Sequence, residues 1–365
     1  MGNTSWKGAH LADHQAMGGM ATGLGIDSLS GEGDMITVFD DFNDVMPSVE
    51  VGAVSAADGT TNVWEENGWV FTDVGTPAND AVAMNNPADA TLHYPSCIRI
   101  DTGDTEDTGG NLQLDFINST AIAAAYTGSG TNDFEFVRRQ FPHLIIAETG
   151  AGVTTLDNTI LTFACRIGFR ADDEAAGNTG GDWDSKAFIG WSVAGQSLVM
   201  TAATGVLTVA AAADQLLGFH IPEDGSIDGI SQRVGTTAYV EGTNFTELVA
   251  AGGVDGTTAN GAVAAGDMMW FDLALRATIT DWSETTGNGW TEFAHRRVTP
   301  VSGALGQPSD KVGPWQKHAT VLTDQIPNHT VALVPTIEVT NGPTADKDGV
   351  VYLDWWSFGH SRVSR

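Results

Sequence analysis

Short runs in which apolar and polar residues alternate recur along most of the chain, and this period of two predicts β-strands. Clear examples are "MITVFDDF" (35–42), "TILTFACRIGF" (159–169), "MMWFDLALRATIT" (268–280) and "VVYLDWWSF" (350–358). Clusters of Gly, Asp, Asn, Thr and Pro separate such runs, as turns require. The Ala-rich stretch 201–219 is ambiguous, but its Val, Thr and Gly content favours strands. We therefore expect about fifteen short strands and no long helix.

The stretch "NVWEENGWVF" (62–71) contains the clearest hairpin signal, because Asn67-Gly68 stands between two apolar-aromatic runs. Many short strands joined by tight turns are typical of sandwich folds. No internal repeat indicates a propeller or a solenoid. The predicted fold is all-β, a two-sheet antiparallel sandwich of jelly-roll type.

Residues 1–33 differ from the rest of the chain, since they hold eight glycines and hardly any apolar periodicity. Such a segment cannot bury enough surface to fold alone. We expect either a disordered tail or an extended N-terminal arm that orders against a neighbouring molecule. Residues 34–365 are expected to form the sandwich, with a small β subdomain within residues 34–130 as a further option.

The closing stretch "GVVYLDWWSFGHSRVSR" (349–365) crowds aromatic residues around one carboxylate. Strict alternation divides its side chains between two faces, with Val351, Leu353 and Trp355 on one and Tyr352, Asp354 and Trp356 on the other. Both faces are largely apolar, so we expect a central strand with Trp355 packed between the two sheets. A sugar-stacking platform and a subunit interface are the alternatives. The candidate core residues are Trp270, Trp355 and Asp354.

Composition adds that the protein is strongly acidic. Its 365 residues include 46 acidic and 16 basic ones, which gives a formal net charge of −30 at pH 7. Such a charge repels duplex DNA and anionic membranes, so we expect no direct nucleic-acid partner and no membrane partner. A salty environment, in which screening lowers the cost of self-repulsion, is favoured over one dedicated basic partner.

Cys97 and Cys165 lie in apolar, strand-like runs, and we expect two buried free thiols, with a disulfide as the alternative. The start of the sequence lacks the charged and apolar regions of a secretory signal, and no apolar run is long enough to span a bilayer. We therefore expect a protein made in a cytoplasm, which it leaves only inside an assembly.

The familiar catalytic patterns are missing from the sequence. Retaining glycosidases on sandwich folds carry carboxylates at alternating strand positions, so that a nucleophile and a general acid share a face. The nearest stretch is "GDWDSK" (181–186), which we expect to be a loop. His10 and His14 are four residues apart, but no helix pattern supports a zinc site there. Nucleophile elbows, Walker loops and dinucleotide fingerprints do not occur either, so we expect no enzyme activity and no cofactor.

Calcium is the ion that the loops would suit best. Two Gly-containing stretches, "DTGDTEDTGGN" (101–111) and "ADDEAAGNTGGDWD" (171–184), gather hard oxygen ligands, although neither has EF-hand spacing. The candidate ligands are Asp101, Asp104, Asp107, Asp182 and Asp184. Solvated acidic turns are the favoured interpretation of both stretches.

Basic residues are few enough that their clustering matters. Arg138-Arg139, Arg296-Arg297 and the tail "HSRVSR" (360–365) hold six of the eleven arginines. In an acidic protein, arginines are natural bidentate partners for carboxylates of a neighbouring subunit, and local charge balance is the alternative. The candidate interface residues are Trp6, Met17, Met20, Arg138, Arg139, Arg296, Arg297, Arg362 and Arg365.

Three segments carry a resemblance to a known family: "DMMWFDLALRATITD", "GWTEFAHRRVTP" and "HTVALVPTIEVTNGPTADKDGVVYLDWWSFGH". Over about residues 130–360, the sequence resembles the concanavalin A-like (laminin G-like) jelly rolls found in structural proteins of tailed bacteriophages. The matching residues are Trp270, Pro335, Ile337, Asn341, Asp354 and Trp355. The resemblance agrees with the sandwich that the alternation predicts.

The resemblance implies a non-enzymatic structural protein of a phage virion, most specifically an auxiliary protein that decorates and cements the capsid. Its expected partners are the major capsid protein and copies of itself, as a dimer or trimer. Its expected location is the capsid surface, after synthesis in the host cytoplasm. The Gly-rich arm and the arginine-bearing tail would hold neighbouring subunits, and the arm would order on assembly.

The alternative function is that of a tail-fibre or receptor-binding protein which recognises a glycan on the host surface. A third class, secreted lectins and glycosidases, is disfavoured because the sequence shows neither a signal peptide nor the carboxylate pattern.

Overall fold

The structure is a computed structural model of the 365-residue chain. It describes residues 34–40, 63–66, 69–74, 82–86, 97–102, 108–114, 159–172, 185–193, 216–221, 227–233, 236–240, 268–281, 288–299, 311–317, 322–323, 333–341 and 348–362. In this part of the chain, no helix has the length and apolar character needed to cross a membrane. The predicted arm, residues 1–33, lies outside the described residues.

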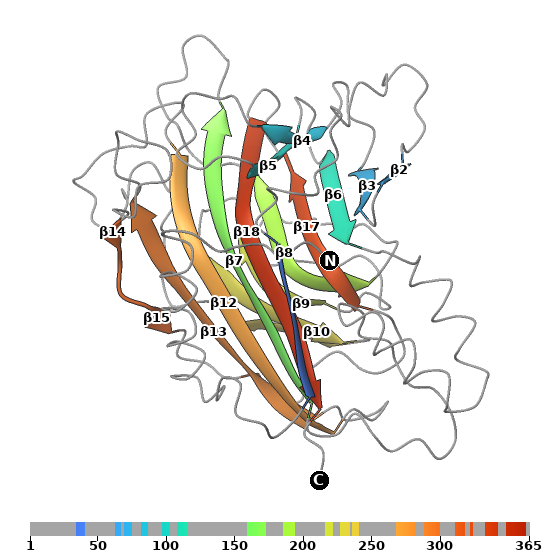
Figure 1. Ribbon diagram of the computed structural model, residues 1–365, viewed down its shortest axis with the longest axis vertical. Coiled ribbons are helices and arrows are strands. Elements are labelled where there is room, and N and C mark those ends of the chain that lie inside the picture. Colours follow the sequence, from blue (N-terminus) through green and yellow to red (C-terminus); the bar gives the residue numbers. More distant parts are fainter. Residues whose placement is uncertain are drawn as a thin grey trace.

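The described strands form two antiparallel sheets (Figure 1). The larger sheet has ten strands: β1 (Asp34–Asp40), β4 (Val82–Asn86), β5 (Cys97–Asp101), β7 (Thr159–Asp172), β12 (Met268–Asp281), β13 (Asn288–Thr299), β14 (Lys311–Val312), β15 (Gln316–Lys317), β16 (Leu322–Thr323) and β18 (Asp348–Arg362). Its main order is β14-β13-β12-β7-β18-β5-β4, while β1 pairs with β18, and β15 and β16 pair with β13.

The smaller sheet has eight strands: β2 (Val63–Glu66), β3 (Trp69–Val74), β6 (Gly109–Leu114), β8 (Lys186–Val193), β9 (Leu216–Ile221), β10 (Asp228–Arg233), β11 (Thr236–Val240) and β17 (Leu333–Thr340). Their order is β11-β10-β9-β8-β17-β6-β3-β2. The predicted all-β, two-sheet antiparallel sandwich is therefore confirmed. The predicted hairpin is confirmed as well, because β2 and β3 pair with Glu66 opposite Trp69.

The main core lies between the two sheets. Phe293 of β13 meets Phe219 of β9 edge to face, with 5.4 Å between ring centroids, so these side chains point inward. Residues directly opposite each other across a ladder share a face. The inward face of the larger sheet therefore includes Leu275, which is opposite Phe293, and Phe163, which is opposite Leu275. All of these side chains are buried, and each contributes roughly 1.5–3 kcal/mol through burial.

The predicted assignment of faces in β18 is wrong beyond Leu353. Leu353 lies opposite Ile167, but Trp355 lies opposite Arg166, so Asp354 is the extra residue of a β-bulge. The bulge reverses the alternation, and Trp356, not Trp355, faces the second sheet. Trp356 contacts Phe163 edge to face, with 6.2 Å between ring centroids. Trp355 is buried on the outer face of the sheet instead.

The first described strand and the last one are neighbours. β1 runs antiparallel to the C-terminal half of β18, with Asp34 opposite Arg362 and Asp40 opposite Trp356. The described strands between residues 34 and 130 enter both sheets, with β1, β4 and β5 in the larger sheet and β2, β3 and β6 in the smaller one. Asp34 and Arg362 therefore lie side by side at one end of the ten-stranded sheet.

Candidate functional site: the outer face of the ten-stranded sheet

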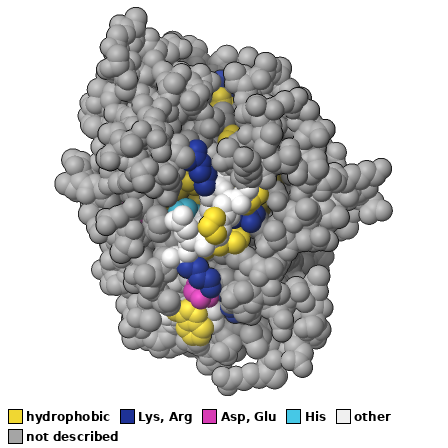
Figure 2. Space-filling view, turned by 90° about the vertical axis from the view of Figure 1, so that its left-hand side faces the viewer, with side chains coloured by type: hydrophobic (Ala, Val, Ile, Leu, Met, Phe, Trp, Pro, Cys, Tyr) yellow, Lys and Arg dark blue, Asp and Glu magenta, His cyan; other side chains and the backbone are white. Residues whose placement is uncertain are grey.

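Among the described side chains, those that reach solvent belong to the ten-stranded sheet or to the short connection between β14 and β15. Every side chain that is described in the eight-stranded sheet is buried. The partly or fully exposed described residues are Arg99, Thr162, Ala164, Arg276, Thr278, Trp290, Glu292, Arg297, Val312, Gly313, Pro314, Trp315, Gln316, Lys317 and Ser357. Figure 2, which views the side where β13 and β15 lie in Figure 1, shows described side chains as a band between atoms drawn in grey.

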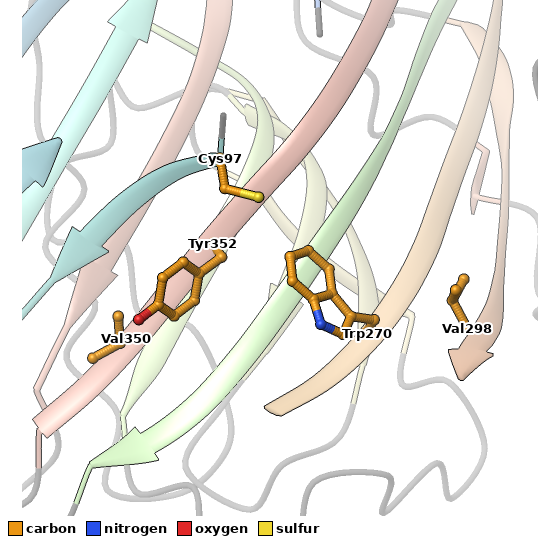
Figure 3. Close-up of a cluster of buried hydrophobic side chains, with 5 residues drawn as sticks. All are labelled: Cys97, Trp270, Val298, Val350 and Tyr352. Carbon is orange, nitrogen blue, oxygen red and sulfur yellow. The ribbon is translucent and has the colours of Figure 1, made fainter. Parts of the chain in front are cut away.

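An apolar row crosses the outer face near the start of β12. Trp270, Val298 and Tyr352 pack with Cys97 and Val350 in one buried cluster, which Figure 3 shows. Trp270 and Tyr352 come from strands on either side of β7, and both lie opposite Gly168. Because glycine has no side chain, the two large rings can extend over β7. The row is therefore a second, smaller core on the outer face.

Two residues further along these strands, the outer face carries a buried ionic cluster. Asp272 lies opposite Arg166 on one side and opposite Arg296 on the other. Arg166 Nε donates to Asp272 Oδ1 at 2.7 Å, and Arg166 Nη2 donates to Oδ2 at 3.2 Å. Arg296 Nε donates to Oδ2 at 2.8 Å, and Arg296 Nη2 lies 2.7 Å from the same oxygen. All three side chains are buried, so the cluster holds two positive charges against one negative charge away from water.

Trp315 covers the next part of the face. Its ring lies 4.4 Å from Cζ of Arg296, which is the geometry of a cation–π contact. It also packs against a cluster of two small side chains in neighbouring strands, Ala274 and Ala294, which Ala164 contacts as well. The connection that carries Trp315 is fixed to β13 by a hydrogen bond of 2.8 Å from Gly313 N to the carbonyl oxygen of Arg297. The small residues thus leave a place that Trp315 fills.

Beyond Trp315 lies a group that we name the accessible strip: Thr162, Arg276, Thr278, Trp290, Glu292 and Lys317. Arg276 is opposite both Thr162 and Glu292, and Trp290 is opposite Thr278. Partial burial lowers the pKa of Arg276 from its usual value, and the negative charge of Glu292 opposes this shift. The indole of Trp290 is 38% exposed, and it is the exposed large hydrophobic side chain of the described region. The strip combines an aromatic surface with both signs of charge.

The outer face of the smaller sheet is polar yet buried. Asn111 Nδ2 donates to Glu338 Oε2 across β6 and β17. The hydroxyls of Ser192 and Thr336 lie 2.7 Å apart, and Gln113 Nε2 donates to both, at 3.2 and 3.3 Å. These bonds satisfy polar groups that have lost water, so they favour one register of β6, β8 and β17.

His220 belongs to the same buried polar face, opposite Phe188 on β8 and Asp228 on β10. Burial is the main cause that lowers the pKa of His220, to about 3, and the positive charge of Lys186 lowers it further. The imidazole is therefore neutral at pH 7. A neutral, fully buried histidine can keep its place in the sheet without a counter-charge.

The two cysteines are buried free thiols. Burial raises the pKa of Cys97, and the nearby charge of Asp354 raises it further. Burial likewise raises the pKa of Cys165, with a smaller contribution from Asp272. Cys97 belongs to the outer apolar cluster, while Cys165 lies opposite Leu273 and Trp356 on the inward face. The sheet separates the two thiols, and both are protonated at neutral pH.

The structure places the candidate core residues inside the molecule. Trp270, Trp355 and Asp354 are all buried. Arg296, a candidate interface residue, is buried and forms an ion pair with Asp272 of its own chain. This pairing is the local charge balance that the sequence analysis gave as the alternative. Arg297 next to it is partly exposed. Arg362 is placed by its backbone in β18 opposite Asp34, and its side chain is outside the described part.

The remaining candidates lie outside what the structure describes. These are Trp6, Met17, Met20, Arg138, Arg139 and Arg365 for the interface and Asp104, Asp107, Asp182 and Asp184 for calcium. Asp101 is placed by its backbone at the end of β5. Among the described side chains, no group of three or more His, Cys, Asp or Glu residues is arranged to hold a metal ion.

Sequence reasoning did not single out Asp272, Arg166, Trp315, Trp290 or His220. The alternation within "MMWFDLALRATIT" already places Asp272 on the same face as Trp270 and Arg276. A carboxylate on such a strand requires a cationic partner, and this requirement is the signal that could have pointed to an ionic cluster. For Trp315 no signal exists, since its strand neighbours are only two residues long.

Comparison with known proteins identifies no family for this chain. No family model matches the sequence, and no curated protein matches it. Among solved structures, an alginate lyase from Chlorella virus is 9% identical, with 77% of this chain and 88% of that chain covered and a TM-score of 0.32. The basic winged bean lectin is also 9% identical, with 91% and 100% covered and a TM-score of 0.35. An alginate lyase from Aplysia kurodai is 9% identical, with 77% and 86% covered and a TM-score of 0.35.

Proposed function

We propose that this protein is a non-enzymatic structural protein of a tailed-phage virion, most specifically an auxiliary protein that decorates and stabilises the capsid. The observation that carries the proposal is the pairing of β1 with the end of β18, in which Asp34 lies opposite Arg362. The Gly-rich segment 1–33 and the arginine-bearing tail therefore adjoin neighbouring strands. Two segments that start from one end of a rigid sandwich suit attachment to a lattice of other subunits.

The buried ionic cluster also favours a structural role over a catalytic one. Both oxygens of Asp272 accept hydrogen bonds from guanidinium groups, at 2.7–3.2 Å. A general base needs an oxygen that can take a proton from a bound substrate. The cluster instead links three neighbouring strands, β7, β12 and β13, and makes the body of the sandwich rigid.

The decisive experiment uses particles that lack this protein and asks whether the purified protein binds them. The full chain should bind at a copy number comparable with that of the major capsid protein. A variant without residues 1–33 should melt at nearly the same temperature, because β1 and β18 are kept, yet it should bind far more weakly. A matched control carries Lys347→Gln, which lies in the sequence between β17 and β18.

Three outcomes would overturn the proposal. The first is a particle that contains no copies of the protein, and the second is unchanged particle binding after removal of residues 1–33. The third is a copy number of only a few per particle, which would indicate a tail fibre.

A receptor-binding protein is the second candidate, and one observation favours it. Trp290 presents a partly exposed indole on the face of a sheet, next to the hydroxyl-bearing Thr278. Partly exposed aromatic rings bind sugars by stacking against their apolar faces. Binding of purified protein to a glycan array, lost in Trp290→Ser, would support this candidate.

A further inference from the structure

β1 is held in the sandwich by one neighbour. Its ladder runs along β18 from Asp34 opposite Arg362 to Asp40 opposite Trp356, and β18 is its one partner among the described strands. By contrast, β7 and β5, which also pair with β18, each have a second partner. A strand that lies near the start of the ordered chain and pairs on one side opens at a lower free energy than strands that pair on both sides. β1 can therefore leave the sheet without breaking any other described ladder.

The edge that β1 occupies does not depend on β1. From Trp356 to Arg362, every residue of β18 is also paired with β7, which runs past it from Cys165 to Thr159. Trp356 is buried and contacts Phe163 of β7 edge to face. β18 therefore keeps its place, and it presents the same backbone donors and acceptors to any strand that takes the position of β1.

The two ends of β1 carry the same charge. Asp34 and Asp40 bracket the apolar run "MITVF" (35–39). If two copies of β1 paired antiparallel about Thr37, Asp34 of one would lie opposite Asp40 of the other at both ends, and like charges in directly opposite positions destabilise a ladder. Against β18, Asp34 lies opposite Arg362, a residue of opposite charge. The charge pattern therefore favours β18 as the partner of β1 and disfavours contact between two β1 edges.

The length of the chain after β1 allows β1 to reach a second molecule. Residues 41–62 lie between β1 and the next described strand, β2. These residues, about 22 in number, span at most roughly 70–80 Å when fully extended. Pairing within one chain then competes with pairing between chains, because both form the same ladder. The balance depends on the effective concentration of β1 at its own β18, which is of the order of millimolar for a tether of this length.

We infer that β1 is exchanged between copies of this protein, so that β1 of one copy pairs with residues 356–362 of β18 in a second copy. The inference rests on the proposed function, which brings copies side by side, and it names the contact between them. A second copy is the partner because it carries the one strand whose fit to this edge the structure shows residue by residue. Exchange of an identical element forms dimers when it is mutual, and rings or chains when each copy passes β1 to the next. Copies held together on a lattice reach effective concentrations at which exchange competes with closure within one chain.

The test uses two full-length single variants, Met35→Cys and Ser361→Cys, because Met35 and Ser361 lie directly opposite each other, at a separation that suits a disulfide. The folded variants are mixed, equilibrated and oxidised, and the products are identified by intact mass without reductant. Exchange joins one variant to the other, a bond that neither variant can form alone. At about one millimolar, the mixed dimer should exceed both like dimers at least about fivefold, and at about ten micromolar this excess should disappear. The native thiols Cys97 and Cys165 are buried and protonated, so they do not compete.

Two controls accompany the mixture. The double variant Met35→Cys/Ser361→Cys should form its disulfide within one chain at about ten micromolar and remain monomeric. In the second control, Lys317→Cys replaces Ser361→Cys, because the exposed Lys317 lies on β15, which β13, β12 and β7 separate from β18. This mixture should give no excess of the mixed dimer. If Met35→Cys fails to fold, Thr37→Cys with Gly359→Cys, the next opposite pair on the same face, provides the same test.

Three outcomes would overturn the inference. Mixed dimers that do not exceed like dimers at any concentration would show that β1 stays in its own chain. An excess of like dimers of Met35→Cys would indicate contact between two β1 strands, and a double variant without an internal disulfide would refute the register. Exchange is measured without particles, so its failure leaves the particle-binding test of the proposed function intact. Conversely, loss of particle binding with intact exchange would refute only the attachment role of residues 1–33.

Discussion

At the scale of single residues, Asp272 joins three neighbouring strands through one carboxylate. Its carboxylate receives hydrogen bonds from Arg166 and Arg296, which come from the two neighbouring strands. Trp315 covers Arg296 from the solvent side at 4.4 Å. A buried pair of this kind depends on each member, since the loss of one leaves the others charged and without water.

We expect Asp272→Asn to lower the free energy of unfolding by about 3–5 kcal/mol, because two buried guanidinium groups lose their counter-charge. Urea unfolding followed by tryptophan fluorescence measures this. Glu292→Gln is the matched control on the same face, where the side chain is partly exposed. It should cost no more than about 1 kcal/mol. Equal losses in the two variants would mean that the ionic cluster does not stabilise the sheet.

His220 should make the free energy of unfolding depend on pH. Its folded pKa of about 3 lies below the ordinary value of 6.5, so the unfolded chain takes up a proton before the folded one does. The contribution is complete above pH 6.5 and is lost as the pH falls toward 3, at about 1.4 kcal/mol per pH unit. We expect His220→Gln to remove this slope. Free energies of unfolding measured between about pH 7 and pH 5 in both proteins test the prediction, and parallel curves would contradict it.

At the scale of elements, β18 decides how the larger sheet is built. It pairs with β7 along its whole length, with β5 near its start and with β1 near its end. The bulge at Asp354 lets both apolar halves of the strand fit, with Leu353 and Trp356 inward and Tyr352 and Trp355 outward. One extra residue thus resolves a conflict between the two halves of one strand.

Deleting Asp354 should therefore be tolerated, because it removes the one residue of the bulge that has no partner in β7. Without it, Leu353 and Trp355 become consecutive opposite Ile167 and Arg166, so Trp355 and Trp356 keep their faces. We expect the deletion variant to stay folded and soluble, whereas insertion of one alanine directly after Asp354 exchanges the faces of Trp355 and Trp356 and should leave the protein unfolded or insoluble. Solubility and near-ultraviolet circular dichroism distinguish the two. A folded insertion variant with native melting would contradict the importance of this register.

The strands and the hairpin could be predicted from the sequence because alternation and Asn67-Gly68 are local signals. The bulge could not, since neither a glycine nor a polar run marks it, and both faces of β18 are apolar. Similarly, "KVGPWQK" (311–317) carries no strand signal, and Pro314 argues against one. The ion pair between Arg296 and Asp272 depends on the register between β12 and β13, and this register cannot be read from the sequence.

At the scale of the whole molecule, the excess of negative charge is the dominant property. Acids outnumber bases by 30. Such an excess destabilises the compact state through self-repulsion, and salt weakens this repulsion. Adaptation to a saline medium would therefore appear as a dependence of stability on ionic strength.

We expect the melting temperature to rise when NaCl is raised from about 0.01 M to about 0.15 M. Each kcal/mol added to the free energy of unfolding should raise it by at least about 2 °C. The physical reason is that the Debye length shortens from about 30 Å to about 8 Å. Differential scanning calorimetry at constant protein concentration measures the change. KCl at equal ionic strength should give the same result, and a flat or falling melting temperature would refute the role of self-repulsion.

The position of β18 also sets the order in which the protein can fold during synthesis. Gly349 N, in β18, donates to Thr102 Oγ1 at 3.0 Å, and the two residues are 247 positions apart in the chain. β7 and β1 also pair with β18. At roughly 5–20 residues per second, this interval takes the ribosome about 12–50 s, during which β5 exposes the edge that later pairs with β18. A nascent chain in this state needs a chaperone or a slow-aggregating sequence. Because β18 lies between β7 and β5 in the larger sheet, a chain that stops short of β18 cannot complete that sheet.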